Sequence, residues 1–507
     1  MRIYKVSSIL FRIIAFLVLF YLPLYILISL LATFSTSNIL VITMNLLLLF
    51  METIGIIFAF YLFYSISGSL FYRTKPFLRK KSSKKPFFSI IIPSHGTPFT
   101  ILRKTIEGAL KIEYDNFEII VSDNGNNLSV TENLQNYCED NQIIFHHKKD
   151  ERGFKAGNIN AVLKLTQGEF VVILDSDHVP RPDLLMIFTP IVEDPTIGFI
   201  QAKVGYRNTR RFYQAANSIL YSQFYEVIET AKDHRGVVLF NGTTGCFRKS
   251  VLNEIGGFSE DTLIEDIDTS LLILARGHQS RFVNHIGSEG LVPETSKAQI
   301  SQLWRWTHGA CNILRIRFRT IINSSQISWN KRFELILNAM AFFSGTSIVF
   351  LFTLLTLMIT AQIPILRLSL FGINTTFIMP SLVSVSFSIT TFLAVYWEER
   401  ETNILRRLMQ LFVFYLFSLG SFLFLISALI DGLLLRNTPN SETSVWDRDF
   451  NVIRNSSMAI GVIVVFIFFL IQSIPNEFSL FLIGGIGSWI FTPLMLLWEE
   501  FFPPQIE

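Results

Sequence analysis

Long apolar runs occupy both ends of the chain. Two runs near the N-terminus, 8–32 and 39–66, carry almost no charge. A helix needs about 20 apolar residues to cross a bilayer, so the pattern predicts membrane helices at both ends. After residue 334 the apolar runs are 335–362, 375–397, 408–435, 457–474 and 478–497.

Residues 67–330 have ordinary mixed polarity, with short β-branched runs alternating with helical spacing. This order implies a mostly parallel sheet with helices on both faces. Ligands of such open sheets bind beyond the carboxyl ends of the strands, where Asp123, Asp175 and Asp177 fall. Strands are expected in FFSIIIP after Pro86 and at 117–125, 143–148 and 169–177, and helices at 101–112 and 155–165.

Charge suggests an orientation for the apolar runs. Basic residues precede the first run and crowd residues 73–85 after the second, whereas the loop 35–38 has none. The N-terminus and the middle segment are therefore expected in the cytoplasm. Half of the chain is hydrophobic and only 16% is charged, below the usual quarter. The net charge of +3 indicates no nucleic-acid partner, and three distant cysteines form no disulfide framework.

The acids Asp175 and Asp177 directly follow an apolar strand of the middle segment. Two carboxylates so close repel unless a cation lies beside them, and Mg²⁺ or Mn²⁺ prefers oxygen ligands. Asp-Ser-Asp is equally good turn chemistry, so both interpretations stay open. Lys155, flanked by Gly153 and Gly157 at a helix start, is suited to binding phosphate.

Several segments, in this order, resemble the membrane-embedded processive family 2 glycosyltransferases: cellulose, hyaluronan, chitin and poly-N-acetylglucosamine synthases. The resemblance covers residues 86–320 and, by layout, the membrane segments. Ser94 and His95 depart from the family's first turn, and Ile264 stands where the family has threonine. The segments are SIIIPSHGTP (89–98), VSDNG (121–125), KAGNIN (155–160), DSD (175–177), FIQAKVGYRN (199–208), NGTTGCFRKSVLNEIGGF (241–258), LIEDIDTS (263–270) and QLWRW (302–306).

The resemblance implies an α/β domain of GT-A type, Rossmann-like with a mostly parallel sheet, inserted in a multi-helix transmembrane region. It implies a catalytic base at Asp266 beside Glu265, and Mg²⁺ or Mn²⁺ on Asp175 and Asp177. The residues implied to bind the nucleotide and donor are Pro93, Asp123, Lys155, Gly157, Asp175, Gln302, Arg305 and Trp306. Those implied to bind the acceptor are Gln201, Gly242, Thr243 and Trp304.

Simpler interpretations of these residues remain open. Glu265 and Asp266 are also favourable charges at a helix start. Trp304 and Trp306 are also typical membrane-interface anchors, and Arg305 suits lipid headgroups. The histidines lack metal-ligand spacing and are interpreted as surface or hydrogen-bonding residues; they include His178, His234 and His308.

The segment 433–449 resembles the family's gating loop, with Thr438 and Pro439 present and Asn440 in place of a lysine. A loop that reaches a cytoplasmic nucleotide places 408–435 along the inner leaflet, although this run is also long enough to span. We therefore expect two transmembrane helices in 1–70 and a cytoplasmic GT-A domain with terminal interfacial helices in 71–320. Residues 321–507 would hold four spanning helices, the interfacial helix 408–435 and the gating-like loop 436–450.

These features predict a multi-pass cell-membrane enzyme with a cytoplasmic catalytic domain. It would be an inverting hexosyltransferase that moves sugar from a UDP-sugar onto a growing β-linked polysaccharide and translocates the product. The alternatives are transfer of one sugar to a lipid carrier, and a catalytically dead scaffold or transporter. Against a transporter, the apolar runs are expected to lack the buried charges that mark ion pathways. The expected partners are the donor, a polysaccharide or lipid-linked acceptor and membrane lipid; no motif identifies the sugar or a protein partner.

Overall fold

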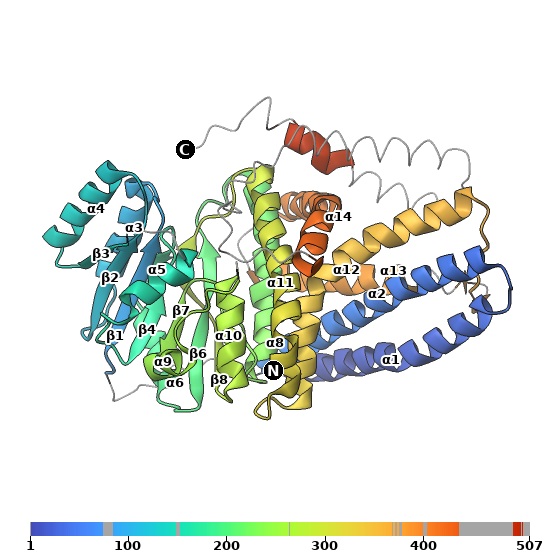
Figure 1. Cartoon of the computed structure of the whole chain (residues 1–507), viewed down its shortest axis with the longest axis horizontal. Coiled ribbons are helices and arrows are strands. Elements are labelled where there is room, and N and C mark those ends of the chain that lie inside the picture. The colour runs from blue at the N-terminus through green and yellow to red at the C-terminus, as the bar shows by residue number, and fades with distance from the viewer. Residues whose placement is uncertain are drawn as a thin grey trace.

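The computed structural model has a sheet domain at one end and long helices at the other (Figure 1). It describes residues 2–74, 85–148, 153–262, 264–367, 369–370, 373–374, 378–398, 403–434, 490–497 and 499. The gating-like loop predicted at 436–450 and the apolar run 457–474 lie outside these residues.

Within the described residues, the sheet domain has eight strands in the order β3-β2-β1-β4-β7-β6-β8-β5. β1 pairs in parallel with β2 and β4, and the pairs β2–β3 and β6–β8 are also parallel. β7 is antiparallel to both β4 and β6, and β5 is antiparallel to β8, so the sheet is mixed. The strands are β1 (Phe88–Ser94), β2 (Phe117–Asp123), β3 (Ile144–His147), β4 (Phe170–Ile173), β5 (Val179–Pro180), β6 (Ile197–Tyr206), β7 (Gly245–Arg248) and β8 (Gln279–Gly290).

Helices cover both faces of this sheet, as expected from strands that read as continuous apolar runs. Ile90 and Ile92 of β1 pack with α3 (Phe99–Leu110), α4 (Leu128–Asp140) and α6 (Leu184–Val192). Ile91 faces the opposite way. It packs in the core formed with α5 (Phe154–Leu163), α9 (Lys249–Ile255) and α10 (Glu265–Ala275). The α/β fold class predicted from the sequence is confirmed.

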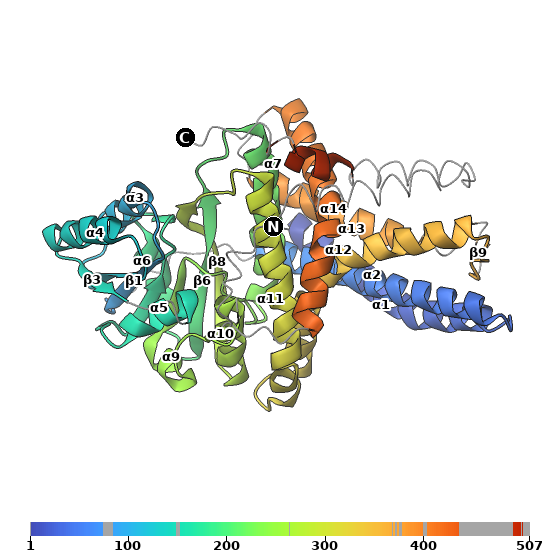
Figure 2. The same ribbon diagram turned by 45° about the horizontal axis from the view of Figure 1, so that its top comes forward.

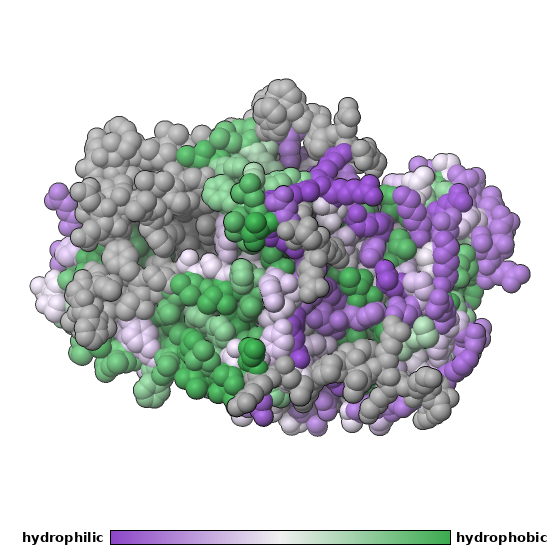
Figure 3. All heavy atoms as spheres, turned by 180° about the vertical axis from the view of Figure 1, so that it is seen from behind, coloured by the Kyte–Doolittle hydropathy of each residue, from purple (hydrophilic) through white to green (hydrophobic). Residues whose placement is uncertain are grey.

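Two N-terminal helices, α1 (Arg2–Thr33) and α2 (Ile39–Tyr72), lie side by side and extend away from the sheet (Figures 1 and 2). Both are long and apolar enough to cross a membrane. Hydrophobic residues gather on the surface at this end, and hydrophilic residues over the sheet domain (Figure 3). Two further helices pack against α2: α12 (Trp329–Thr360) and α13 (Ile378–Glu398).

A second group of helices connects the sheet domain with this bundle. α11 (Ser296–Asn323) and α14 (Ile404–Leu434) pack on each other and run across the direction of α1 and α2 (Figure 2). At Gly432 of α14, a Cβ atom would lie 2.6 Å from the carbonyl oxygen of His308. The remaining helices of this region are α7 (Phe212–Gln223), the π-helix η1 (Phe224–Glu229) and α8 (Thr230–Asp233).

Buried ion pairs join the bundle to the sheet. Glu226 of η1 accepts hydrogen bonds from Lys203 of β6 and from Arg73, which follows α2. Asn284 of β8 also donates to Glu226, at 3.0 Å. The Arg73 guanidinium lies 3.6 Å from the ring centre of Trp397 on α13. One carboxylate therefore ties two strands to the end of a candidate membrane helix.

The expectation that the apolar helices lack buried charge is wrong. Glu52 of α2 and Arg367 have fully buried side chains, with Nη2 and Oε2 3.0 Å apart. Nη2 of Arg367 also donates to the Asn45 carbonyl oxygen at 3.1 Å. The sequence did not predict this ion pair, because Arg367 lies outside the apolar runs. A buried charge is tolerated when it is paired and hydrogen-bonded, and this pair holds the segment after α12 against α2.

Candidate active site

The nucleotide-side residues predicted from the first two strands lie at the carboxyl edge of the sheet. Pro93 of β1 pairs with Ser122 of β2, next to Asp123. Asp123 is almost fully buried, and its Oδ2 accepts a hydrogen bond from the Gly125 amide at 3.1 Å. A Cβ on Gly125 would lie 2.7 Å from the Gly96 backbone. The turns after β1 and β2 therefore touch, and Asp123 supports their contact.

Lys155 joins three segments that are far apart in the sequence. Its helix α5 starts after Gly153, whose φ of 73° suits glycine, and a Cβ there would lie 2.8 Å from Gly157. The ammonium Nζ lies 2.6 Å from Asp175 Oδ1 and 2.6 Å from the Gly242 carbonyl oxygen. Burial alone would lower the pKa of Lys155, but the neighbouring acids outweigh it and raise this pKa.

Glu265 and Asp266 occupy the first turn of α10 beside that ammonium. Lys155 Nζ is 3.7 Å from Glu265 Oε1. A Cβ on Gly242 would lie 3.3 Å from both Asp266 Oδ2 and Lys155 Nζ. Burial, and then the charge of Glu265, raise the pKa of Asp266 to about 7, although Lys155 opposes the shift. A carboxyl group with such a pKa is suited to accept a proton near neutral pH.

The two acids of the Asp-Ser-Asp segment lie in a turn beyond β4. The predicted strand 169–177 is shorter, because regular pairing ends at Ile173. The His178 amide donates to the Asp175 carbonyl oxygen at 3.0 Å, which closes the turn. Burial raises the pKa of Asp177, but the charges of His178 and Arg207 outweigh it, so this pKa is lowered. Asp177 is therefore held as a carboxylate.

His178 belongs to the same cluster, which the sequence analysis missed. Its Nδ1 lies 2.7 Å from Asp177 Oδ1, and one ligand atom from each of Asp175, Asp177 and His178 lies within 4.8 Å of the others. Two carboxylates and an imidazole suit a divalent cation such as Mg²⁺ or Mn²⁺. The signal was a histidine directly after the acid pair. Its ring packs on Gly290, where a Cβ would approach Nε2 to 2.3 Å.

The residues predicted to bind the acceptor hold the segment before β7 in place. Gln201 Nε2 donates to the Thr243 carbonyl oxygen at 2.9 Å, and Thr243 Oγ1 accepts from the Asp175 amide at 2.9 Å. Gln201 Oε1 also accepts from the Asn241 amide at 3.1 Å. Both side chains are buried. These bonds join β6 to the turn of Asp175, and the acceptor role of both residues stays a prediction.

The predicted residues of α11 point in different directions. Burial lowers the pKa of Arg305, while the charge of Glu265 opposes this shift. Gln302 accepts a hydrogen bond from Tyr221, and Trp306 lies edge-on to the same tyrosine at 6.0 Å. Trp304 instead faces α14, where its Nε1 donates to the Ser427 hydroxyl at 3.0 Å.

The part of the chain that forms this site matches a known protein family. Residues 86–309 match the family described as "Glycosyltransferase like family 2". Together with the α/β sheet, this match makes that part of the chain a family 2 glycosyltransferase domain of GT-A type. The resemblance to family 2 glycosyltransferases that the motifs indicated is thereby confirmed for this part of the chain.

The alignments with curated relatives cover about half of this chain. Cellulose synthase 1 catalytic subunit [UDP-forming] from Komagataeibacter xylinus is 29% identical over 240 residues, which is 46% of this chain and 32% of that protein. Glucomannan 4-beta-mannosyltransferase 7 from Arabidopsis thaliana is 27% identical over 268 residues, or 50% and 48%. The chain spans about a third of the length of the bacterial cellulose synthase subunits it matches.

A similar solved structure is the mannosyltransferase PcManGT from Pyrobaculum calidifontis in complex with GDP-Man and Mn2+. The sequence identity is 18% and the TM-score is 0.46, with 76% of this chain and 99% of that chain covered.

Proposed function

We propose that the protein is an inverting hexosyltransferase that moves a sugar from a UDP-sugar onto the end of a growing β-linked polysaccharide. One observation carries this proposal. Lys155 lies 2.6 Å from Asp175 and 3.7 Å from Glu265, so three separate motifs meet at one ammonium. An excess of acids around one cation, at the carboxyl edge of a sheet, suits a site for a diphosphate and a proton acceptor.

Each group has a role in a single displacement. Asp266 takes the proton from the acceptor hydroxyl as that oxygen bonds to the anomeric carbon, and Glu265 raises the pKa of Asp266. Lys155 and Arg305 bind the diphosphate that leaves with the electron pair of the broken bond. Because attack comes from the face opposite the leaving group, an α-linked donor gives a β-linked product.

Asp175, Asp177 and His178 would hold a divalent cation, Mg²⁺ or Mn²⁺. The cation would supply positive charge to the leaving diphosphate. The residues themselves support this assignment, because one ligand atom from each of the three lies within 4.8 Å of the others. The backbone amide of Asp175, bonded to Thr243, fixes the turn in which these ligands lie.

We place the protein in the cell membrane with its catalytic domain in the cytoplasm. The proposed divisions are 1–70 and 321–507 as transmembrane regions and 71–320 as the catalytic domain. The length and apolarity of α1 and α2 support the first region. α11 and α14 run across these helices (Figure 2), which favours an interfacial position for 408–435. Cytoplasmic nucleotide sugars then reach the site directly.

The size and linkage of the product test this function. Purified protein receives each UDP-sugar in turn, and GDP-mannose as a comparison, with Mg²⁺ or Mn²⁺, and nucleotide release and product length are measured. We expect release of UDP and a β-linked ladder or high polymer. A single lipid-linked sugar would replace the polymer proposal, and absence of transfer from every donor would refute both.

Metal binding should depend on the turn that contains Asp175 and Asp177. We expect Asp177→Ala to lower the affinity for UDP in Mn²⁺ at least tenfold, because a carboxylate ligand is lost. His178→Asn should lower Mn²⁺ affinity by a smaller factor, since two carboxylates remain. Manganese electron paramagnetic resonance measures free ion directly, without turnover.

His278→Asn is the matched control, because His278 contacts Glu254 at 2.9 Å, away from this turn. Equal UDP affinity of Asp177→Ala and wild-type protein, with and without chelator, would refute the metal assignment.

A further inference from the structure

Ile264, which directly precedes the acids of α10, lies against a glycine of α11. Its side chain is buried. A Cβ atom on Gly309 would lie 2.7 Å from both Cγ1 and Cγ2 of Ile264 and 2.8 Å from its Cδ1. The optimal separation of non-bonded carbon atoms is about 3.5–4.0 Å. The two helices therefore meet at a distance that only glycine allows at position 309.

The isoleucine side chain has little freedom to move away from this contact. Isoleucine is β-branched, and its χ1 torsion is restricted. Both branches of Ile264 would lie at the same short distance from a Cβ atom at position 309, so rotation about χ1 would exchange one close branch for the other. A larger residue at 309 would therefore displace the backbone of Ile264. That backbone leads directly into Glu265 and Asp266.

A second contact fixes the same helix one turn later. Arg317 of α11 binds both carboxylate oxygens of Asp268, with Nε 2.7 Å from Oδ1 and Nη2 2.8 Å from Oδ2. The Asp268 side chain is fully buried, and its amide donates to the Ile264 carbonyl oxygen at 3.2 Å. Because α10 is held at Asp268, a larger side chain at position 309 would displace Ile264 and tilt the first turn of α10. The rest of the helix would keep its position.

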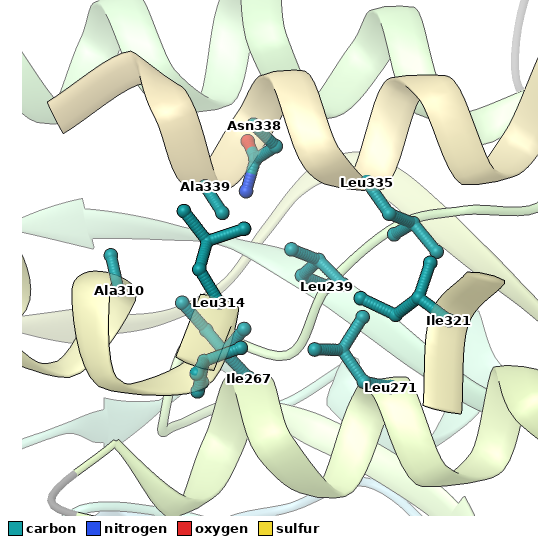
Figure 4. A pocket seen from close by; sticks show the side chains of 10 residues that line it. Leu239, Ile267, Leu271, Ala310, Leu314, Ile321, Leu335, Asn338 and Ala339 are labelled. Atoms are coloured by element: carbon teal, nitrogen blue, oxygen red, sulfur yellow. The ribbon is translucent and has the colours of Figure 1, made fainter. Parts of the chain in front are cut away.

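Packing between these contacts is incomplete. A small apolar cavity lies where α10, α11 and α12 meet, and the side chains shown in Figure 4 surround it. Ile267 and Leu271 of α10 face it from one side, and Ala310 and Leu314 of α11 from another. Leu271 and Leu274 pack in one hydrophobic core with residues of α11 that include Ile313, so the later turns of α10 are held and its first turn depends on the contacts at residues 264 and 268.

We propose that Gly309 is a positioning residue that, through Ile264, sets the separation between the α10 acids and Arg305. Gly309 lies one helical turn after Arg305 on α11, and Ile264 lies two residues before Asp266 on α10. The contact thus joins the two elements that carry the proton acceptor and the diphosphate-binding guanidinium. This inference rests on the proposed function, because it concerns the geometry of that reaction.

Gly309→Ala tests the position of the acids. We expect kcat to fall at least tenfold, because a displacement of about 1 Å in a reacting group costs up to about 100-fold. The KM for the UDP-sugar and the affinity for UDP should stay within threefold, because the three atoms nearest to a Cβ at position 309 all belong to Ile264 and none to the turns of Asp123 and Asp177. A wild-type kcat in Gly309→Ala would overturn the inference.

Second substitutions at Ile264 distinguish positioning from general damage. Ile264→Ala removes both branches, so in the Gly309→Ala background it should restore kcat to the level of Ile264→Ala alone. Ile264→Val and Ile264→Thr keep two branches on Cβ and should not restore it. Equal rescue by alanine and valine, or none by alanine, would contradict the proposed contact.

Gly68→Ala is the matched control for a packing defect. Gly68 lies in α2, and a Cβ there would lie 2.8 Å from Ala231 Cβ, a contact of similar closeness away from the site. We expect a lower unfolding temperature with unchanged kcat. An equal fall of kcat in Gly68→Ala and Gly309→Ala, at equal loss of stability, would refute positioning.

Failure of the proposed function can be distinguished from failure of the inference about Gly309. If the wild-type protein transfers no sugar from any donor, that function fails. The thermal double-mutant cycle of Ile264→Ala and Gly309→Ala then still reports the contact. Additive effects on the unfolding temperature would show that the two residues do not interact.

Discussion

Asp266→Asn is expected to lower the rate of sugar transfer about 10²–10⁴-fold, the usual contribution of a general base. The amide keeps the shape of the side chain but cannot accept the proton of the acceptor hydroxyl. Asp266 has a pKa of about 7 because of its burial and the charge of Glu265, so the wild-type group accepts a proton near neutral pH. UDP affinity, measured by calorimetry, should change by less than about threefold.

The matched control for this variant is Asp115→Asn. Asp115 pairs with Lys85 at 2.5 Å on the surface, with its side chain 82% exposed, and an exposed pair contributes little stability. Transfer should be unchanged in that variant. Wild-type turnover in Asp266→Asn would remove Asp266 from its assigned role and leave Glu265 as the candidate base.

Lys155→Met should impair both binding and turnover. The substitution removes the ammonium that lies between Asp175 and Glu265, and leaves the carboxylate of Glu265 beside Asp266 without its positive partner. Loss of one partner from a close charge pair typically costs at least tenfold in binding. We therefore expect UDP affinity to fall at least tenfold and the rate at saturating donor to fall about 100-fold. Calorimetry and steady-state kinetics separate the two effects.

Lys249→Met tests for a general effect of losing a lysine. Lys249 Nζ also donates to a carbonyl oxygen, that of Thr166, at 2.5 Å, but it lies at the start of α9 and away from the acids. Its kinetics should match wild type. Lys155→Arg should not restore activity, because the Gly242 segment leaves little space around the ammonium. Unchanged UDP affinity in Lys155→Met would contradict a diphosphate role.

Local patterns in the sequence were sufficient to predict the strands and helices of the first half of the sheet. The continuous apolar run at β1 predicts a strand buried on both faces, and Ile90 and Ile91 do face separate cores. The glycine-flanked start of α5 placed Lys155 correctly at a helix N-terminus. Such features depend on residues close in sequence, where periodicity and turn chemistry carry the information.

Contacts between distant residues could not be predicted in this way. β7 is only four residues long, and its insertion between β4 and β6 depends on pairing with both neighbours. The approach of Ile264 to Gly309 joins residues from two helices, and neither residue is unusual in its own segment. Trp304 faces α14 because of the packing of that helix. These arrangements arise from tertiary packing, which local propensity does not encode.

The joint at Glu226 limits how the catalytic domain can move. A hinge requires groups that separate easily, whereas separating Glu226 from Lys203 and Arg73 would leave buried charges unpaired, at a cost of about 3–5 kcal/mol. The sheet and the helix bundle are therefore held together at this point, and in the proposed reaction the reaction centre would keep the same alignment with α2 from one transfer to the next. If the product advances stepwise, as a polymerising enzyme requires, we expect smaller elements rather than the whole catalytic domain to move.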